Sequence, residues 1–203
     1  MSLCLAPRWP LVVALWLIVG LLSPVRAQQP AAGSVELAPF TGGQFASVTF
    51  EDPDKPGGSV SAKSLMFGAD FVFYPHRHVG AGALVVRQAV SLGLTGKESE
   101  QSSTLAGALV KFRLPSGRRT SLAIVSAGGW AGSRLASAQT DTTSQTSGAF
   151  FLAGAEVSVF TGRSTAVDIG VRGVLDRFHL GTDRPATYES GVMVVFGFAL
   201  WAP

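Results

Sequence analysis

Eight segments of this chain alternate apolar and polar side chains with a period of two residues. They occupy about 34–44, 64–74, 79–91, 104–114, 120–132, 148–160, 166–177 and 188–201. Successive side chains of a strand point to opposite faces, so this period predicts strands with one apolar face. In segments 79–91 and 120–132 both faces are nearly apolar, which the alternation does not explain.

The connections between these segments alternate in length. The long ones span 45–63, 92–103, 133–147 and 178–187 and are rich in small, polar and acidic residues. The short ones span 75–78, 115–119 and 161–164, and each of them contains Arg. Because strands joined by tight turns pair antiparallel, this rhythm predicts hairpins in an up-and-down order.

Residues 1–27 follow the order of a secretory signal peptide. Arg8 precedes an apolar run over 11–22, and Ala27 is the small residue of a cleavage site. The run has 12 residues, which is short of the ~20 that a membrane-spanning helix needs. We expect 1–27 to be removed on export and 28–203 to form one barrel domain; an uncleaved N-terminal anchor is the alternative.

Charge and cysteine content argue against several classes of function. Arg8 and Arg26 leave with the signal peptide, which lowers Lys plus Arg from 16 to 14 against 13 acidic residues. This near-neutral balance gives no reason to expect a nucleic-acid partner. Cys4, the single cysteine, leaves as well, so disulfides and thiolate chemistry are not expected in the mature chain.

The polar faces of the segments carry few charges. Only 14% of the residues are charged, against about 25% in a typical soluble domain. Faces built mostly from Gly, Ala and Ser would not solvate the exterior of a soluble ligand-binding barrel, which is the other arrangement that alternation permits. A closed barrel in lipid leaves no backbone group unpaired. The sequence therefore predicts an all-β fold, an eight-stranded antiparallel up-and-down transmembrane β-barrel.

Isolated charges on the polar faces are expected to lie inside this barrel. The interior of eight strands is just wide enough for side chains to fill, so we expect a network of ion pairs that plugs it. A narrow channel for small solutes is the alternative. The predicted interior network consists of Glu36, Asp70, Arg87, Lys111, Arg113, Glu156, Asp168, Arg172 and Asp176.

Aromatic residues recur where strands run toward the short turns. Such residues concentrate at the two interfaces of a membrane, so they predict a girdle on the periplasmic side. This girdle is expected to contain Phe73, Tyr74, Phe112, Phe160, Phe198 and Trp201. Trp130, Phe150, Phe151, Phe178 and Tyr188 lie near the opposite strand ends and predict a second girdle.

His179 is the single candidate for catalysis. Asp176 or Asp183 could orient it and Thr182 could act as the nucleophile, because these residues are close in sequence. A histidine in a loop beside aromatic residues is the simpler interpretation, and we expect no enzymatic activity. His76 and His78 have no third ligand nearby in sequence, and zinc takes three or four. No metal or cofactor is expected.

The whole segment 28–203 resembles the small eight-stranded outer-membrane β-barrels of Gram-negative bacteria, of the OmpA transmembrane-domain and OmpX type. Its last strand carries Glu189, Gly191, Val194 and Phe196 at the spacing of that family's assembly signal. The deacylase pattern of His, one residue and Ser, known in some related barrels, is absent at His179.

The resemblance implies a place in the outer membrane and contact with its lipid and lipopolysaccharide. It also implies insertion by the barrel-assembly machinery and an unidentified surface ligand. We expect a non-enzymatic barrel with a structural or surface-interaction role. The alternatives are an enzyme that modifies lipid A or peptides, and the narrow channel.

Overall fold

The structure is a computed structural model of the 203-residue chain. It describes residues 31–52, 55–94, 97–115, 119–137, 143–179 and 186–202, and the statements below concern these residues. The predicted signal peptide, 1–27, lies outside them. No helix in this part of the chain is long and apolar enough to cross a membrane.

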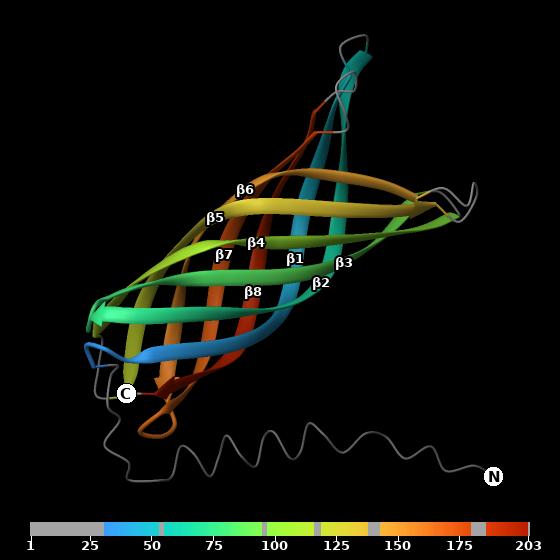
Figure 1. Cartoon of the computed structure of the whole chain (residues 1–203). Coiled ribbons are helices and arrows are strands. Elements are labelled where there is room, and N and C mark those ends of the chain that lie inside the picture. Colours follow the sequence, from blue (N-terminus) through green and yellow to red (C-terminus); the bar gives the residue numbers. More distant parts are fainter. Residues whose placement is uncertain are drawn as a thin grey trace, which may run out of the picture.

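Eight antiparallel strands form a closed barrel (Figure 1). Each strand pairs with its neighbours in sequence, and β1 pairs with β8 to close the ring. All eight strands expected from the alternation are present. They are β1 (Val35–Asp52), β2 (Lys55–His76), β3 (Val79–Leu94), β4 (Lys97–Pro115), β5 (Thr120–Ser137), β6 (Thr143–Phe160), β7 (Thr165–His179) and β8 (Ala186–Ala202).

The two ends of the barrel differ in their connections. At one end, here the turn end, short connections join β2 to β3, β4 to β5 and β6 to β7, and β1 begins and β8 ends there (Figure 1). The opposite end is the hairpin end, where the strands run past their predicted limits. Phe45 pairs with Lys63 and Phe50 with Gly58, inside a segment predicted as a long loop. That prediction is wrong for most of 45–63, because strand pairing continues where the apolar alternation stops.

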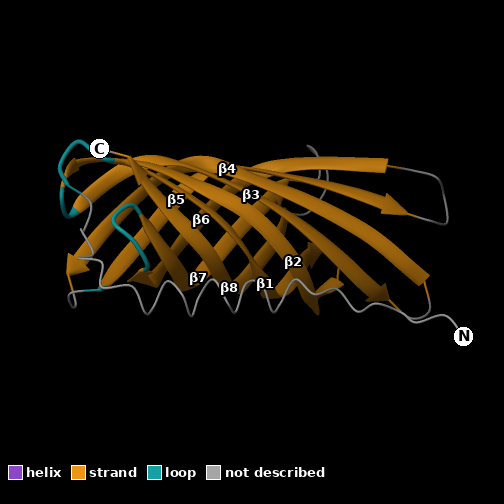
Figure 2. Cartoon of the chain, turned by 90° about the horizontal axis from the view of Figure 1, so that it is seen from below, coloured by secondary structure: helices purple, strands orange, loops and turns teal. Residues whose placement is uncertain are grey.

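The strands are tilted and staggered around the barrel. A path through directly paired residues starts at Glu36 and comes back to β1 at Ala46, ten positions nearer the hairpin end. Closing a sheet with such a stagger requires tilted strands, typically by 35–45°. Figure 2 shows this tilt as a crossing of the near and far walls.

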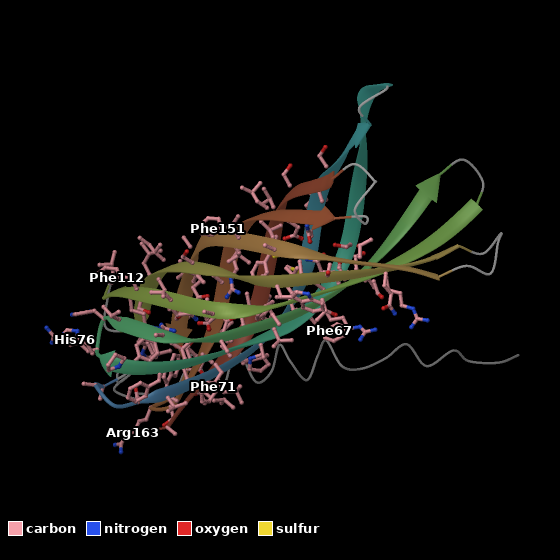
Figure 3. All side chains as sticks on the ribbon, turned by 45° about the horizontal axis from the view of Figure 1, so that its top comes forward. Phe67, Phe71, His76, Phe112, Phe151 and Arg163 are labelled. Carbon is pink, nitrogen blue, oxygen red and sulfur yellow. The ribbon has the colours of Figure 1, made fainter. Side chains whose placement is uncertain are left out.

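The outer face carries an apolar belt to which every strand contributes. Among the described residues, 22 large apolar side chains are exposed. Phe67, Phe71, Phe112 and Phe151 are examples that point away from the ribbon in Figure 3. The complete belt is Leu37, Phe45, Leu65, Phe67, Phe71, Phe73, Val79, Val85, Val110, Phe112, Leu114, Ile124, Trp130, Phe151, Val157, Ile169, Val171, Leu175, Val192, Val194, Phe198 and Leu200.

The inner face is layered along the barrel. The charged side chains other than Asp176 lie near the turn end, and a cluster of apolar side chains follows toward the hairpin end. Beyond that cluster lies a second set of buried polar side chains, which consists of Gln44, Ser64, Gln88, Ser103, Ser133 and Asp176. The apolar layer includes Met66, Leu84, Val86, Leu105, Phe150, Leu152, Val174 and Met193. This layer explains why segment 79–91 is apolar on both faces: Leu84 and Val86 fill the interior while Val85 belongs to the outer belt.

Candidate functional site

Six charged side chains from five strands meet in the interior near the turn end. Each has at most 3% of its side chain exposed. Three cations face three carboxylates, so the group is neutral as a whole, as buried charges require. We call it the charge cluster: Glu36 of β1, Asp70 of β2, Lys111 and Arg113 of β4, Glu156 of β6 and Arg172 of β7.

Lys111 lies at the centre of the charge cluster. Its Nζ is 2.7 Å from an oxygen of Glu36 and 2.6 Å from an oxygen of Glu156. A third carboxylate, that of Asp70, is 3.5 Å away. A single ammonium thus joins carboxylates from β1, β2 and β6, across the full width of the barrel.

Arg172 joins the charge cluster to the apolar layer. Its guanidinium donates hydrogen bonds to both carboxylate oxygens of Asp70, at 2.6 and 3.3 Å, and to Glu156 at 3.1 Å. The same group lies 4.8 Å from the ring centroid of Phe40, within the range of a cation–π contact. Phe40 belongs to the apolar cluster.

Arg113 is held at the turn end of the cluster by hydroxyl groups and aromatic rings. It donates to Glu36 at 2.8 Å, to Ser121 at 2.8 Å and to Ser158 at 2.9 Å. Its Nε donates to the hydroxyl of Tyr74 at 2.8 Å. The guanidinium carbon also lies 5.1 Å from the ring centroid of Trp201.

Glu36 receives hydrogen bonds from four side chains. Tyr74 donates at 2.6 Å and the indole N–H of Trp201 at 3.1 Å, in addition to Lys111 and Arg113. Hydrogen bonds to a carboxylate are stronger than neutral ones and offset the cost of burying it. The four donors come from β2, β4 and β8, so Glu36 ties three other strands to β1.

The predicted periplasmic girdle needs a correction for Tyr74, Phe160 and Trp201. Phe73, Phe112 and Phe198 point outward, as predicted. Tyr74, Phe160 and Trp201 are instead buried inside the barrel. Phe160 and Trp201 are in ring contact there, with centroids 5.3 Å apart.

The alternation itself carries the signal for these inward aromatics. Tyr74 has the same parity as Asp70, and Phe160 the same parity as Glu156. Gly80 on β3 makes room for the tyrosine, since a Cβ there would come within 2.8 Å of its ring.

Arg87 also needs a correction, because it is exposed on the outer face of β3. It pairs with Phe67 on one side and Thr104 on the other, away from the interior. Polar residues occupy both parities at this point of β3, Arg87 outward and Gln88 inward, so parity alone does not give the direction of Arg87. The other two predicted members, Asp168 and Asp176, are buried on the inner face of β7, on either side of Arg172 in sequence.

The interior is filled across its width in the apolar layer and in the charge cluster. Leu84, Leu105, Leu152 and Met193 have no exposed surface, which leaves no water column beside them. Lys111 and Glu36 are equally buried in the charge cluster, which lies nearer the turn end. The arrangement of these described residues can hold the strands in register.

The histidines are not brought together with these groups. The backbone of His179 ends β7 at the hairpin end, between Ser147 and Ala186, and its side chain lies outside the described part of the structure. Thr182 and Asp183, its proposed partners, also lie outside it. The rings of His76 and His78 are 5.5 Å apart in the turn after β2. The described residues contain no group of three or more His, Cys, Asp or Glu that could hold a metal ion.

Several solved structures of bacterial proteins are similar to this chain. The chain is similar to Neisserial surface protein A, with 13% identity, a TM-score of 0.53, and 83% of this chain and 98% of that one covered. It also matches Ail, the attachment invasion locus protein of Yersinia pestis, with 10% identity, a TM-score of 0.48, and coverage of 83% and 99%. OprG, an outer membrane protein of Pseudomonas aeruginosa, matches with 10% identity, a TM-score of 0.45, and coverage of 88% and 99%.

No protein-family model matches the sequence, and none of the curated proteins matches it. The similarity to Neisserial surface protein A establishes the small eight-stranded barrel fold. At this level of identity, it carries the fold alone.

The charge cluster predicts a large cost for removing one of its cations. Arg172→Met should destabilise the barrel by about 3–5 kcal/mol, because Asp70 and Glu156 are left buried without that partner. The matched variant Arg87→Met alters an exposed arginine of the outer face and should change stability little. The temperature at which the compact form disappears on a denaturing gel measures both. Equal melting of Arg172→Met and the wild type would contradict a structural role of the cluster.

The filled interior predicts the absence of conductance. The folded barrel, inserted into a planar bilayer, should give no steady current steps above those of a protein-free bilayer, because neither layer leaves room for a water column. Reproducible single-channel steps from the wild type would show that the two layers open in the membrane.

Proposed function

We propose that this chain is a non-enzymatic integral β-barrel of the outer membrane of a Gram-negative bacterium, with a structural or surface-interaction role. The observation that carries the proposal is the outer apolar belt. Soluble monomers rarely expose a contiguous apolar patch larger than a few hundred Å². Among the residues that the structure describes, 22 large apolar side chains, from every strand, lie exposed around the barrel. A bilayer is the solvent that suits such a surface, and a closed barrel leaves no strand edge unpaired in it.

The two edges of the belt favour the same environment. Phe73, Phe112 and Phe198 are exposed toward the turn end, and Trp130 and Phe151 toward the hairpin end. Aromatic side chains at both borders of an apolar band are characteristic of outer-membrane barrels. In that class the segments that project farthest from the membrane lie outside, so we assign the turn end to the periplasm and the end with the extended hairpins to the cell surface.

The extended hairpins are the part best suited to contact other molecules. Pairing continues to Phe50 and Gly58 in the first of them, which carries the chain beyond the belt. Surface segments held on a rigid scaffold commonly carry binding functions. We expect the surface ligand and the headgroups of lipopolysaccharide to meet the protein there, while outer-membrane lipid surrounds the belt. We also expect the barrel-assembly machinery to insert the protein.

A non-enzymatic role is supported by the state of the buried charges. Glu36 and Glu156 are engaged by Lys111, Arg113 and Arg172, and the two glutamates are buried. General acid–base catalysis needs a group within reach of a substrate. The carboxylates and cations of the cluster form ion pairs with one another instead.

The proposed bilayer environment predicts a position-dependent cost of charge on the outer face. Val171→Arg, in the middle of the belt, should destabilise the barrel by about 2–4 kcal/mol, whereas Leu114→Arg, near the turn end, should cost about 0–1 kcal/mol. Urea unfolding in phospholipid vesicles measures the difference. Nearly equal, small losses for both variants would place the belt in water and overturn the proposal.

The proposed lack of enzymatic activity is tested on His179. Wild type and His179→Ala should both leave lipopolysaccharide, phospholipid and a peptide substrate intact, as followed by released fatty acid and by peptide cleavage. Release by the wild type that disappears in His179→Ala would assign a catalytic role to this histidine and reject the non-enzymatic proposal.

A further inference from the structure

The outer wall is hollowed in its part toward the hairpin end. A depression of about 790 Å³ is lined by residues of β6, β7, β8, β1 and β2. Five of its lining residues form one line of directly paired positions that crosses these strands: Ala153, Gly173, Val192, Phe45 and Lys63. We call this depression the outer groove.

Gly173 creates the depth of the outer groove. A Cβ added to it would meet only the backbone oxygen of Ala153, at 3.7 Å, which is ordinary contact. The fold therefore does not require glycine at this position. The missing side chain instead leaves space between larger neighbours, Phe151 and Leu175 on one side and Val192 on the other.

The stagger of the barrel gives the outer groove a direction. A line of paired residues climbs toward the hairpin end as it passes from β6 to β2, because these four steps are half of the circuit that accumulates the ten-residue offset. Four steps between neighbouring strands at about 4.8 Å each give a length of about 19 Å. The acyl region of one leaflet is about 15 Å deep, half of a hydrocarbon core of ~30 Å.

The outer groove ends at a cation. Lys63 is exposed, and its Nζ lies 6.0 Å from the ring centroid of Phe45. Two hydroxyl side chains of the lining, Ser47 and Ser190, face each other in the neighbouring row of paired residues. The end toward the cell surface is thus positively charged and polar, whereas the deeper part around Gly173 is apolar.

We propose that the outer groove binds one acyl chain of an anionic, phosphate-bearing membrane lipid, with the phosphate at Lys63. The inference rests on the proposed position of the barrel in a membrane. Inside a bilayer an acyl chain gains little from the hydrophobic effect, so selection comes from close packing in the hollow beside Gly173. The ammonium of Lys63 adds attraction for a phosphate at the level where headgroups lie.

Native mass spectrometry of the purified barrel in detergent tests this proposal. The probes are dioleoylphosphatidylglycerol and dioleoylphosphatidylcholine, which share their acyl chains and differ in net charge. The wild type should retain one phosphatidylglycerol and prefer it about five-fold over phosphatidylcholine, the factor that one nearby lysine provides. Lys63→Gln should remove this preference, and Gly173→Leu should reduce retention of both lipids.

Two matched variants serve as controls. Ala83→Leu places the same leucine side chain on the outer wall of β3, and Arg87→Gln removes a charge there; neither residue lines the outer groove. Both should retain lipid as the wild type does.

Three outcomes would overturn the lipid proposal. Equal losses of lipid retention in Ala83→Leu and Gly173→Leu would indicate adsorption over the whole belt. An unchanged preference for phosphatidylglycerol in Lys63→Gln would rule out the phosphate contact at Lys63. A dimer that dissociates in Gly173→Leu would assign the outer groove to a second copy of the chain. The gel mobility of the folded barrel is measured in parallel, so that failure of the lipid site is distinguished from failure to form the membrane barrel.

Discussion

The pairing of β1 with β8 is the constraint on which the rest of this structure depends. It gives every strand two neighbours and so removes the sheet edges. It also fixes the ten-residue stagger and, with it, which parity of each strand faces inward. A slip of one residue in β1 would turn Glu36 outward and Leu37 inward. The ion pairs of the interior and the apolar belt outside are therefore two consequences of one register.

The small cross-section then decides how the interior is filled. Buried ion pairs are weak evidence for stability by themselves, because the loss of hydration offsets much of the attraction. In this barrel each cation meets more than one carboxylate, and Lys111 reaches three. Such a cluster can form only when the strands that carry it are in register. We regard specification of register as its main physical contribution, with Arg172 and Phe40 as the link to the apolar layer.

The sequence predicts most of this fold because the two faces of each strand meet different surroundings. The outer face belongs to the apolar belt, and the inner face lines the interior of the barrel. Alternation located all eight strands, and the parity of Glu36, Lys111 and Arg172 matches their burial. The girdle assignment failed for Tyr74, Phe160 and Trp201, although their parity points inward, because an aromatic at a strand end suits both an interfacial girdle and the lining of the interior. Alternation also failed to predict the paired parts of the long hairpins, because strand pairing continues there although apolar and polar side chains are not separated between the two faces. The sequence did not predict Tyr74 and Trp201 as donors to Glu36, because no single-strand pattern shows which strands stand opposite one another.

The stagger also determines where a site on the outer wall can be continuous. Gly173 lies on β7 and Lys63 on β2, and the line of paired residues that joins them crosses from β8 to β1. These two positions are distant in sequence, and the closure connects them through Val192 and Phe45. The outer groove is thus a property of the completed ring, as the charge cluster is, since Glu36 of β1 meets Trp201 of β8 across the same seam. Binding on the outside and packing on the inside depend on the same strand pair.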